Sequence, residues 1–235
     1  MTPAIDLRTC GPSEDEWAGV CARLGAFVWP ACRRVVVVSP HPDDETYGAG
    51  GLIGVAVGMG LSVTIIAVTD GEAAYPHPDL ARVRRVELSN AVDCLDPTAA
   101  IETVWLGFAD SRVTGSLPAL TAEITRLLDS DDLVVCPMPD DGHPDHAAVS
   151  VAATQAAAAI GAAVRWFPVW AWHCHDPGRT TIADGQRLTL SPDVRARKER
   201  AASCYSSQTE GETPVVPARM LARLLRSFEV FVVPR

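Results

Sequence analysis

Apolar and polar residues follow one another along the chain in blocks whose spacing alternates between that of strands and that of helices. Val35–Ser39 is a continuous β-branched run, typical of a strand buried on both faces. Gly48–Met59 and Asp79–Leu95 instead carry apolar residues over helical lengths. Strands and helices that alternate in this way predict an α/β fold. We expect a Rossmann-like, doubly wound, mostly parallel sheet with helices on both faces.

Similar blocks continue to the end of the sequence. Further strands are predicted at Leu61–Thr69, Ile101–Leu106, Leu133–Cys136, Val164–Trp172 (a strand or a strand pair) and Phe228–Val233. Further helices are predicted at Pro118–Leu128, Asp145–Ile160, Arg195–Tyr205 and Pro217–Leu225. A strand order of 3-2-1-4-5 would place the first strand beside the fourth, at the point where the order reverses and where such sheets bind ligands.

Two regions flank the regular part of this pattern. Residues 1–33 are predicted to form an irregular lead-in with a short helix around Glu14–Leu24, capped by Ser13. Residues 34–235 are predicted to form a single domain, whose last third is richer in Pro and Gly and forms a short C-terminal extension.

Charge and cysteine content narrow the range of functions. Lys and Arg total 20 against 29 Asp and Glu, and no basic run occurs, so neither nucleic acid nor an anionic membrane is expected as a main partner. No apolar stretch reaches the ~20 residues of a transmembrane segment. The seven cysteines include no C-x-x-C pair, which favours free thiols and a cytoplasmic location. No pattern in the sequence indicates an oligomeric state.

Two polar clusters carry the candidate chemistry, and each follows a predicted core strand. "SPHPDDE" occupies residues 39–45, and "PMPDDGHPDH" occupies residues 137–146. His41 and Asp44 are spaced i, i+3, as are His143 and His146, so each pair shares one face at the start of a helix. Because the two strands are expected to be neighbours, the two clusters should meet.

The residues in these clusters suit a catalytic zinc site with an open position. Zinc of this kind takes three His, Asp or Glu ligands, and His41, Asp44 and His146 make such a set. The same ligands also suit Fe2+. A lone HPD tripeptide is more often a turn followed by a helix cap, but capping does not explain why both clusters contain histidine.

The remaining polar residues of the two clusters suit the other roles that hydrolysis at such a metal site requires. Asp43 is expected to accept the proton of the attacking water, and His143 to donate a hydrogen bond to the developing oxyanion. Asp145 and Glu45 are expected to orient the ligand imidazoles.

"SPHPDDE" and "HPDH" resemble the paired signatures of the PIG-L or LmbE-like family of zinc-dependent N-deacetylases, over roughly residues 34 to 233. "TDGE", "RRVE", "LGFAD" and the terminal "SSQ…FEVF" follow in the order expected for that family. The resemblance implies an LmbE-like fold and a small-molecule substrate, an amino-sugar conjugate. It also implies zinc ligands His41, Asp44 and His146, Asp43 as general base and then acid, and His143 as transition-state stabiliser.

Other positions follow the family less closely. Arg84 and Asp110 match positions that often touch the substrate. Some members carry a tyrosine shortly before HPDH, where this chain has Asp140-Asp141-Gly142, and with this departure we expect a different substrate.

Two further segments each have a simpler structural interpretation beside a functional one. Gly48-Ala49-Gly50-Gly51 fails the spacing of a dinucleotide-binding loop, and its glycines are expected to let the helix approach the sheet closely. In "WAWHCHDP", residues 170–177, a strand would place His173 and His175 on one face and Cys174 on the other. Trp170 and Trp172 would then offer an apolar platform to a sugar, although an aromatic core strand fits equally well.

The sequence as a whole predicts a metal-dependent hydrolase that removes an acetyl group from an N-acetylglucosamine-containing conjugate. Two alternatives stay open at this point. One is a zinc amidase that acts on a non-sugar amide or a thiol conjugate, and the other is a non-catalytic α/β protein that binds a sugar or nucleotide. The acyl group, the pathway and the native metal are not specified by the sequence.

Overall fold

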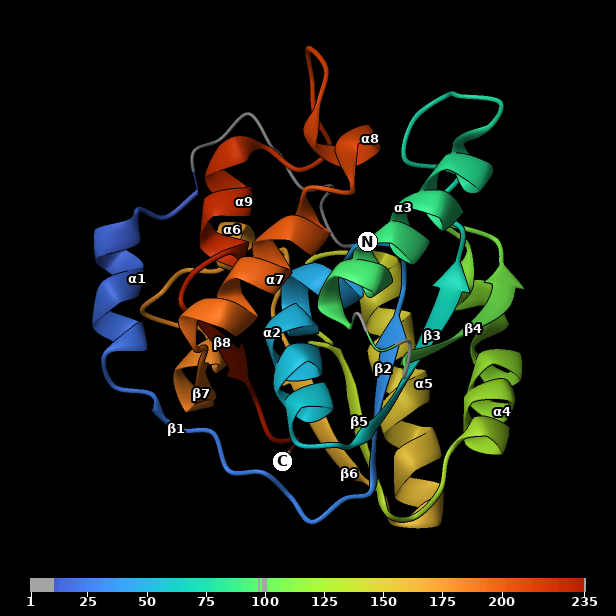
Figure 1. Ribbon diagram of the computed structural model, residues 1–235, viewed down its shortest axis with the longest axis horizontal. Coiled ribbons are helices and arrows are strands. Elements are labelled where there is room, and N and C mark those ends of the chain that lie inside the picture. Colours follow the sequence, from blue (N-terminus) through green and yellow to red (C-terminus); the bar gives the residue numbers. More distant parts are fainter. Residues whose placement is uncertain (1–10, 97, 99–100, 235) are drawn as a thin grey trace.

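A five-stranded parallel sheet forms the centre of the molecule (Figure 1). The computed structural model describes residues 11–96, 98 and 101–234. The strand order is β4-β3-β2-β5-β6, which confirms the predicted α/β fold and the predicted neighbours. The strands are β2 (Arg34–Ser39), β3 (Ser62–Thr69), β4 (Ile101–Phe108), β5 (Asp132–Pro137) and β6 (Ala163–Phe167).

The valines of β2 divide the core into two layers. Val35 and Val37 belong to the apolar cluster on one face of the sheet, and Val36 and Val38 to the cluster on the other. Successive side chains of a strand point to opposite faces, so a run of four valines fills both layers. The start of the strand is also fixed, since Arg34 donates to both carboxylate oxygens of its cross-strand partner Asp132, at 2.9 and 2.7 Å.

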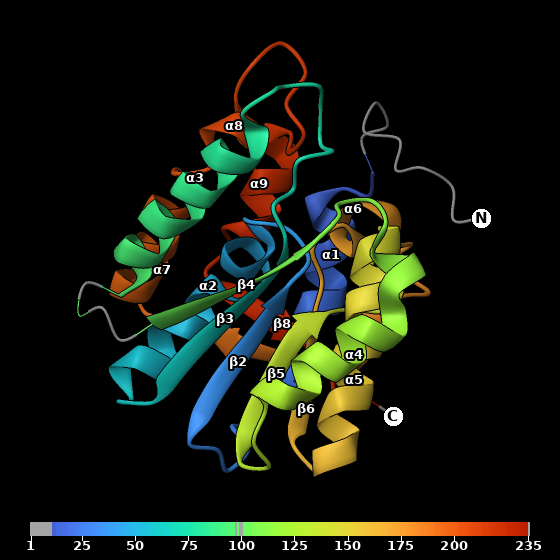
Figure 2. The same ribbon diagram turned by 90° about the vertical axis from the view of Figure 1, so that its right-hand side faces the viewer.

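Helices cover both faces of the sheet (Figure 2). On one face lie α4 (Leu117–Leu127) and α5 (Pro144–Ile160). On the other lie α2 (Asp44–Gly58), α3 (Leu80–Leu95) and α7 (Pro192–Ala202). The α2 helix begins four residues earlier than predicted, because Asp43 serves as its N-cap residue. The last two residues of the polar cluster, Asp44 and Glu45, therefore lie in the first turn of this helix.

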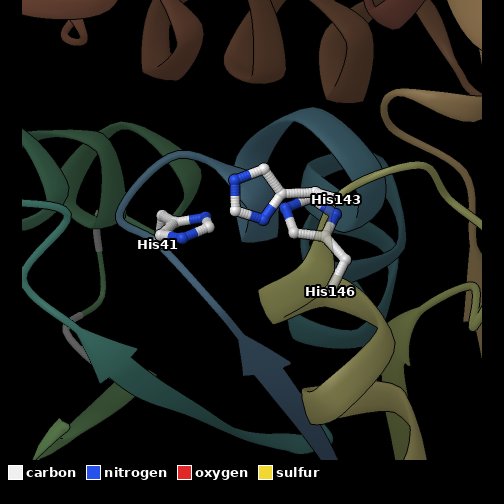
Figure 3. A group of neighbouring side chains, drawn as sticks. All are labelled: His41, His143 and His146. Carbon is white, nitrogen blue, oxygen red and sulfur yellow. The ribbon is translucent and has the colours of Figure 1, made fainter. Parts of the chain in front are cut away.

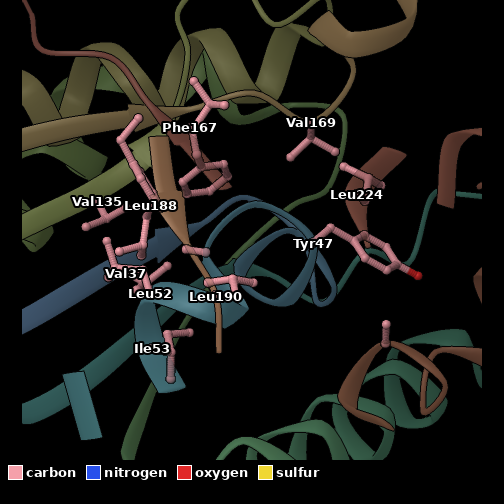
Figure 4. Packing of buried hydrophobic residues seen from close by; sticks show 14 of the residues in the cluster. Val37, Tyr47, Leu52, Ile53, Val135, Phe167, Val169, Leu188, Leu190 and Leu224 are labelled. Carbon is pink, nitrogen blue, oxygen red and sulfur yellow. The ribbon is translucent and has the colours of Figure 1, made fainter. Parts of the chain in front are cut away.

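Glycines let α2 lie close to its neighbours, as the sequence predicted. A Cβ atom at Gly48 would collide with the ring of Phe167 from β6. One at Gly51 would meet Leu190. Figure 4 shows the packing around this contact, with Leu52 and Ile53 of α2 near the sheet residue Val37.

A second sheet of three strands, which the sequence did not predict, lies beside the first. Its strands are β1 (Gly25–Ala26), β7 (Gln186–Thr189) and β8 (Phe228–Phe231). Strand β8 pairs antiparallel with β7, and a bridge between Trp166 and Val232 connects the two sheets. Strand β8 was predicted, at Phe228–Val233, whereas β1 and β7 were not, because such short strands give little periodic signal.

The lead-in and the C-terminal third add short elements around this frame. The helix cap predicted at Ser13 is present, in the form of a capping box with Glu16, and α1 runs from Glu14 to Cys21. Trp17 is fully buried and donates from Nε1 to the backbone oxygen of Trp172 at 3.0 Å.

The domain division at residue 33 stays a prediction. The other short elements are η1 (Val113–Ser116), α6 (Ala171–Cys174), η2 (Thr181–Asp184), α8 (Ser206–Thr209) and α9 (Ala218–Leu224).

The strand predicted at Val164–Trp172 is wrong in its second half. Strand β6 ends at Phe167, and Ala171–Cys174 is the short helix α6. Pro168 has no backbone N–H to extend the ladder. The next three N–H groups, of residues 169 to 171, all donate to the Asp141 carboxylate at 2.8–3.0 Å. These bonds turn the chain away from the sheet.

Two further observations bear on the sequence predictions. Within the described ranges, no helix combines the length and the apolar character that crossing a membrane requires. The six described cysteines are free thiols, and Cys10 lies outside the described residues. The cytoplasmic location stays a prediction.

Candidate active site and metal centre

The two polar clusters meet at the carboxyl ends of β2 and β5, where the strand order reverses. His41 lies in the turn between β2 and α2, and His143 and His146 lie at the start of α5. Figure 3 shows the three imidazoles directed toward one another. Each offers a nitrogen, and these nitrogens lie within 4.8 Å of one another. The predicted convergence of residues about a hundred positions apart is therefore present.

Asp44 lies between two of these imidazoles. Its Oδ2 atom is 3.1 Å from Nδ1 of His41 and 3.2 Å from Nε2 of His146. The same oxygen accepts the backbone N–H of His41 at 3.1 Å, which fixes the carboxylate at the first turn of α2. The structure thus brings the three predicted ligands together through one carboxylate oxygen.

Asp141 holds His146 from the opposite side of its ring. Its Oδ2 atom lies 2.7 Å from Nδ1 of His146, and both side chains are completely buried. If Nδ1 donates to this carboxylate, Nε2 carries the lone pair. The sequence did not predict this role for Asp141; its only signal was an acidic residue five positions before His146.

Two more carboxylates surround the other nitrogen of His41. Nε2 lies 3.2 Å from Oδ1 of Asp110 and 3.4 Å from Oδ2 of Asp145. Asp145 also accepts the backbone N–H of Ser111 at 2.7 Å. Asp145 therefore lies beside a predicted ligand imidazole, as expected, and Asp110 contacts the same nitrogen of that imidazole.

Glu45 occupies a different place from the one predicted. It contacts no imidazole among the described residues, and instead accepts the backbone N–H of Asp43 at 3.0 Å and the hydroxyl of Ser39 at 3.1 Å. The hydroxyl of Tyr205, 160 positions away in sequence, donates to its other oxygen. Glu45 therefore supports the turn that carries Asp43, because its carboxylate accepts hydrogen bonds from both Asp43 and Ser39.

Asp43 has an unusual backbone and electrostatic environment. Its φ of 136° and ψ of −32° are rare for a residue with a Cβ atom, and such strain persists only where surrounding contacts hold it. Burial raises the pKa of the Asp43 carboxyl to about 8, although the nearby Arg84 acts in the opposite direction. An N–H nitrogen of Arg84 lies 3.2 Å from Oδ2 of Asp43.

The carboxylates around His41 and His146 favour positive charge on these two imidazoles. Burial alone would lower the pKa values of His41 and His146. The adjacent carboxylates outweigh it, so that the pKa of His41 lies well above its usual value and that of His146 is raised to about 9. His143 differs, because burial and the neighbouring imidazoles lower its pKa to about 3.

These residues fit a divalent cation. Nε2 of His146 is buried and has no directed hydrogen-bond partner within residues 11–96, 98 and 101–234, although Asp44 lies 3.2 Å away. A buried, unpartnered imidazole nitrogen is costly unless a ligand satisfies it. Two imidazoles and one carboxylate are a donor set of the kind that catalytic metal sites use.

The cluster lies at one end of a cavity of about 450 Å³. Asp43, Asp44, Arg84, Asp110 and His143 all line it. Ligand pockets for small molecules are commonly of this size. The predicted catalytic and substrate-contacting residues, with one exception, therefore border the same space.

The exception is Trp172, which does not line this cavity. It is 5% exposed, and its ring packs edge-on against Trp17 with centroids 4.8 Å apart. Trp170 lines the cavity instead. The helical turn of α6 breaks the strand alternation on which the prediction at Trp172 relied, and this sends its side chain into the core.

The histidines of the same segment have structural partners. His175 contacts the hydroxyl of Thr180 through Nδ1 at 2.9 Å and the backbone oxygen of Asp140 through Nε2 at 2.6 Å. His173 is buried in α6. Neither residue belongs to the groups of described residues able to hold a metal ion.

Comparison with known proteins agrees with this geometry. The family model described as "PIG-L: GlcNAc-PI de-N-acetylase" matches residues 36–157, just over half of the chain. The chain belongs to the PIG-L family. The matched stretch runs from β2 to α5 and includes both polar clusters.

Individual PIG-L relatives show the extent of the likeness. A 1D-myo-inositol 2-acetamido-2-deoxy-alpha-D-glucopyranoside deacetylase of Rhodococcus jostii is 31% identical over 161 residues, which cover 56% of this chain and 55% of the relative. A probable N-acetyl-alpha-D-glucosaminyl L-malate deacetylase of Bacillus subtilis is 32% identical over 135 residues, 52% of this chain and 60% of the relative. The chain thus spans little more than half the length of these two relatives.

A solved structure supports the fold. The N,N'-diacetylchitobiose deacetylase of Pyrococcus horikoshii superposes with a TM-score of 0.64 at 19% identity, over 86% of this chain and 84% of that one. At this identity the likeness concerns the fold alone.

Proposed function

We propose that this protein is a metal-dependent hydrolase that removes the acetyl group from an N-acetylglucosamine-containing conjugate. The observation that carries the proposal is the Asp44 carboxylate between His41 and His146, with Asp43 beside it at the cavity. The relatives of the PIG-L family that match this chain are named as deacetylases of such conjugates. This supports a sugar substrate over a non-sugar amide, and catalysis over a purely binding role.

His41, Asp44 and His146 would hold the metal, and zinc suits this His–His–Asp set. Fe2+ suits the same donors and is the alternative metal. When bound, such an ion supplies a Lewis acid that lowers the pKa of water and polarises the substrate carbonyl. Asp141 and Asp145 would orient the two imidazoles from behind, at 2.7 and 3.4 Å.

Asp43 would take the proton of the attacking water and deliver it to the leaving amine. A general base works best when its pKa lies near the working pH, and burial raises the pKa of Asp43 toward neutrality. The strained backbone of Asp43 is held by Glu45, and its carboxylate is held by Arg84 at 3.2 Å. A fixed base loses little entropy in reaching the transition state.

His143 would stabilise the oxyanion as a neutral donor. Its Nδ1 accepts the backbone N–H of Asp145 at 3.2 Å, so the proton of the neutral ring lies on Nε2. Its lowered pKa keeps the ring neutral. A positioned neutral N–H donor of this kind resembles the donors of an oxyanion hole.

The test is acetate release from a panel of N-acetylglucosaminyl compounds by protein that has been stripped of metal and then reloaded with zinc. Zinc should restore activity that a chelator removes. Asp43→Asn should abolish turnover at near-stoichiometric zinc content, whereas Asp79→Asn, in the exposed loop before α3, should leave both unchanged. Loaded wild-type protein that releases no acetate from any member would refute the proposal, and an active Asp43→Asn variant would refute the assignment of the base.

A further inference from the structure

Part of the lining of this cavity is apolar and is called here the apolar wall. Val169 and Trp170 contribute to it from the turn after β6, and Val215 and Val216 from the segment between α8 and α9. Tyr47 of α2 completes this wall. These residues come from three separate parts of the chain, so only the folded protein assembles them.

Hydrogen bonds fix this apolar wall in place. The backbone N–H groups of Val169 and Trp170 donate to Asp141, the same carboxylate that holds the predicted ligand His146. The backbone N–H of Val216 donates to the backbone oxygen of Gln208 at 2.8 Å. The wall is therefore tied to the metal centre and is already formed before a ligand binds, which reduces the entropy lost on binding.

The charges around the cavity disfavour an anionic ligand. Asp43, Asp44 and Asp110 line it, and among the described lining residues Arg84 is the sole arginine or lysine. The guanidinium of Arg84 already donates to the backbone oxygens of Gly71 and Pro42 at 3.0 and 2.6 Å. A carboxylate brought into this space would meet like charges, and the Arg84 guanidinium is already paired with the Asp43 carboxylate.

The valine and tryptophan side chains of this wall disfavour a polyol, because hydroxyls placed against them lose their hydrogen bonds to water. An apolar group gains from the same contact through burial, and a ring can also pack on the indole of Trp170.

We infer that the apolar wall is an aglycone subsite, which binds an uncharged group with an apolar, ring-sized face attached to the acetamido sugar. This inference rests on the proposed deacetylase function and specifies its substrate class. It separates this chain from the two relatives above, whose names give inositol and malate as the attached groups.

Binding tests the subsite without any need for turnover. The probes are four deacetylated glucosaminides that carry phenyl, methyl, inositol or malate aglycones, titrated by calorimetry into zinc-loaded protein. The phenyl compound should bind about tenfold more tightly than the methyl compound, as expected for burial of one ring face. The inositol and malate compounds should bind no more tightly than the methyl one.

A charge placed on the wall should remove this preference. Val215 is half-buried and lies outside the helices, so the Val215→Asp variant should fold. Its affinity for the phenyl compound should fall to that for the methyl compound, and its affinity for the methyl compound should stay the same. Val28→Asp is the matched control, because Val28 is 60% exposed and does not line the cavity. Trp170→Ala is a second variant, which adds no charge, and it should lose the preference for the phenyl compound in the same way.

The outcomes separate the subsite from the proposed function. Inositol or malate compounds that bind as tightly as the phenyl compound would overturn the subsite, and so would a phenyl preference that survives both wall variants. Acetate release from the four acetylated compounds should follow the order of binding. If no acetate is released but the phenyl preference holds, the deacetylase proposal fails and the subsite stands.

Discussion

One carboxylate, Asp141, links the candidate metal centre to the substrate cavity. It contacts Nδ1 of His146 at 2.7 Å and accepts three backbone N–H groups from residues 169–171. The orientation of a predicted metal ligand and the position of the cavity wall therefore depend on the same buried side chain. The corresponding region of the sequence, "PDDGH", gives no indication that its second acid has this double role.

Asp141→Asn should weaken metal binding without removing any predicted ligand. The amide keeps one acceptor oxygen but loses the charge that favours the Nδ1-protonated imidazole, so affinity for zinc should fall about 10- to 100-fold. A competition titration against a chromophoric chelator measures this. Asp140→Asn is the matched control, because its exposed side chain bonds to the Thr181 hydroxyl and contacts neither His41 nor His146. Equal affinities in the two variants would contradict the role of Asp141.

Metal binding should stabilise the fold. An ion that binds only the native state at 100 times its Kd adds about 2.7 kcal/mol, which for a chain of this length raises the Tm by roughly 5–10 °C. Thermal unfolding with zinc and with excess chelator measures the shift. In Asp44→Asn the shift should vanish, while Asp15→Asn on the exposed face of α1 should retain it. An unchanged shift in Asp44→Asn would place the ion elsewhere.

Tyr205 is a positioning residue that acts through Glu45. Its hydroxyl donates to Glu45, whose other oxygen holds the backbone N–H of the strained Asp43. Tyr205→Phe should therefore lower kcat roughly tenfold through misplacement of the base, with KM and zinc content unchanged. Steady-state kinetics together with metal analysis measure this split. A rise in KM at constant kcat would instead indicate a substrate contact.

Close packing at Gly48 should make its substitution costly. A methyl group there would collide with Phe167, so Gly48→Ala should lower the free energy of unfolding by about 1–3 kcal/mol. Gly58→Ala, at the open end of the same helix, should raise it by up to about 1 kcal/mol, because nothing lies within 4 Å and alanine favours helix. Chemical denaturation measures both, and destabilisation of similar size at the two positions would argue against the packing explanation.

Local signals in the sequence were sufficient for the main architecture. The valine runs and the alternation of strands with helices predicted the parallel sheet, its strand order and the meeting of the two clusters, because a parallel sheet places the carboxyl ends of its strands at one edge. The glycines of α2 also have the close-packing role expected of them. The assignments of individual residues as metal ligands and base stay predictions.

The tertiary structure decided what depends on contacts between distant residues. Asp141 takes three N–H groups from the turn after β6, which converts a predicted strand into a turn and helix and buries Trp172. Glu45 turns from the imidazoles to the backbone of Asp43, because Tyr205 meets it from 160 positions away. The sequence by itself determined which side chains reach the edge of the sheet. Hydrogen bonds across the fold decided which way each one points, since no local pattern encodes a partner a hundred residues away.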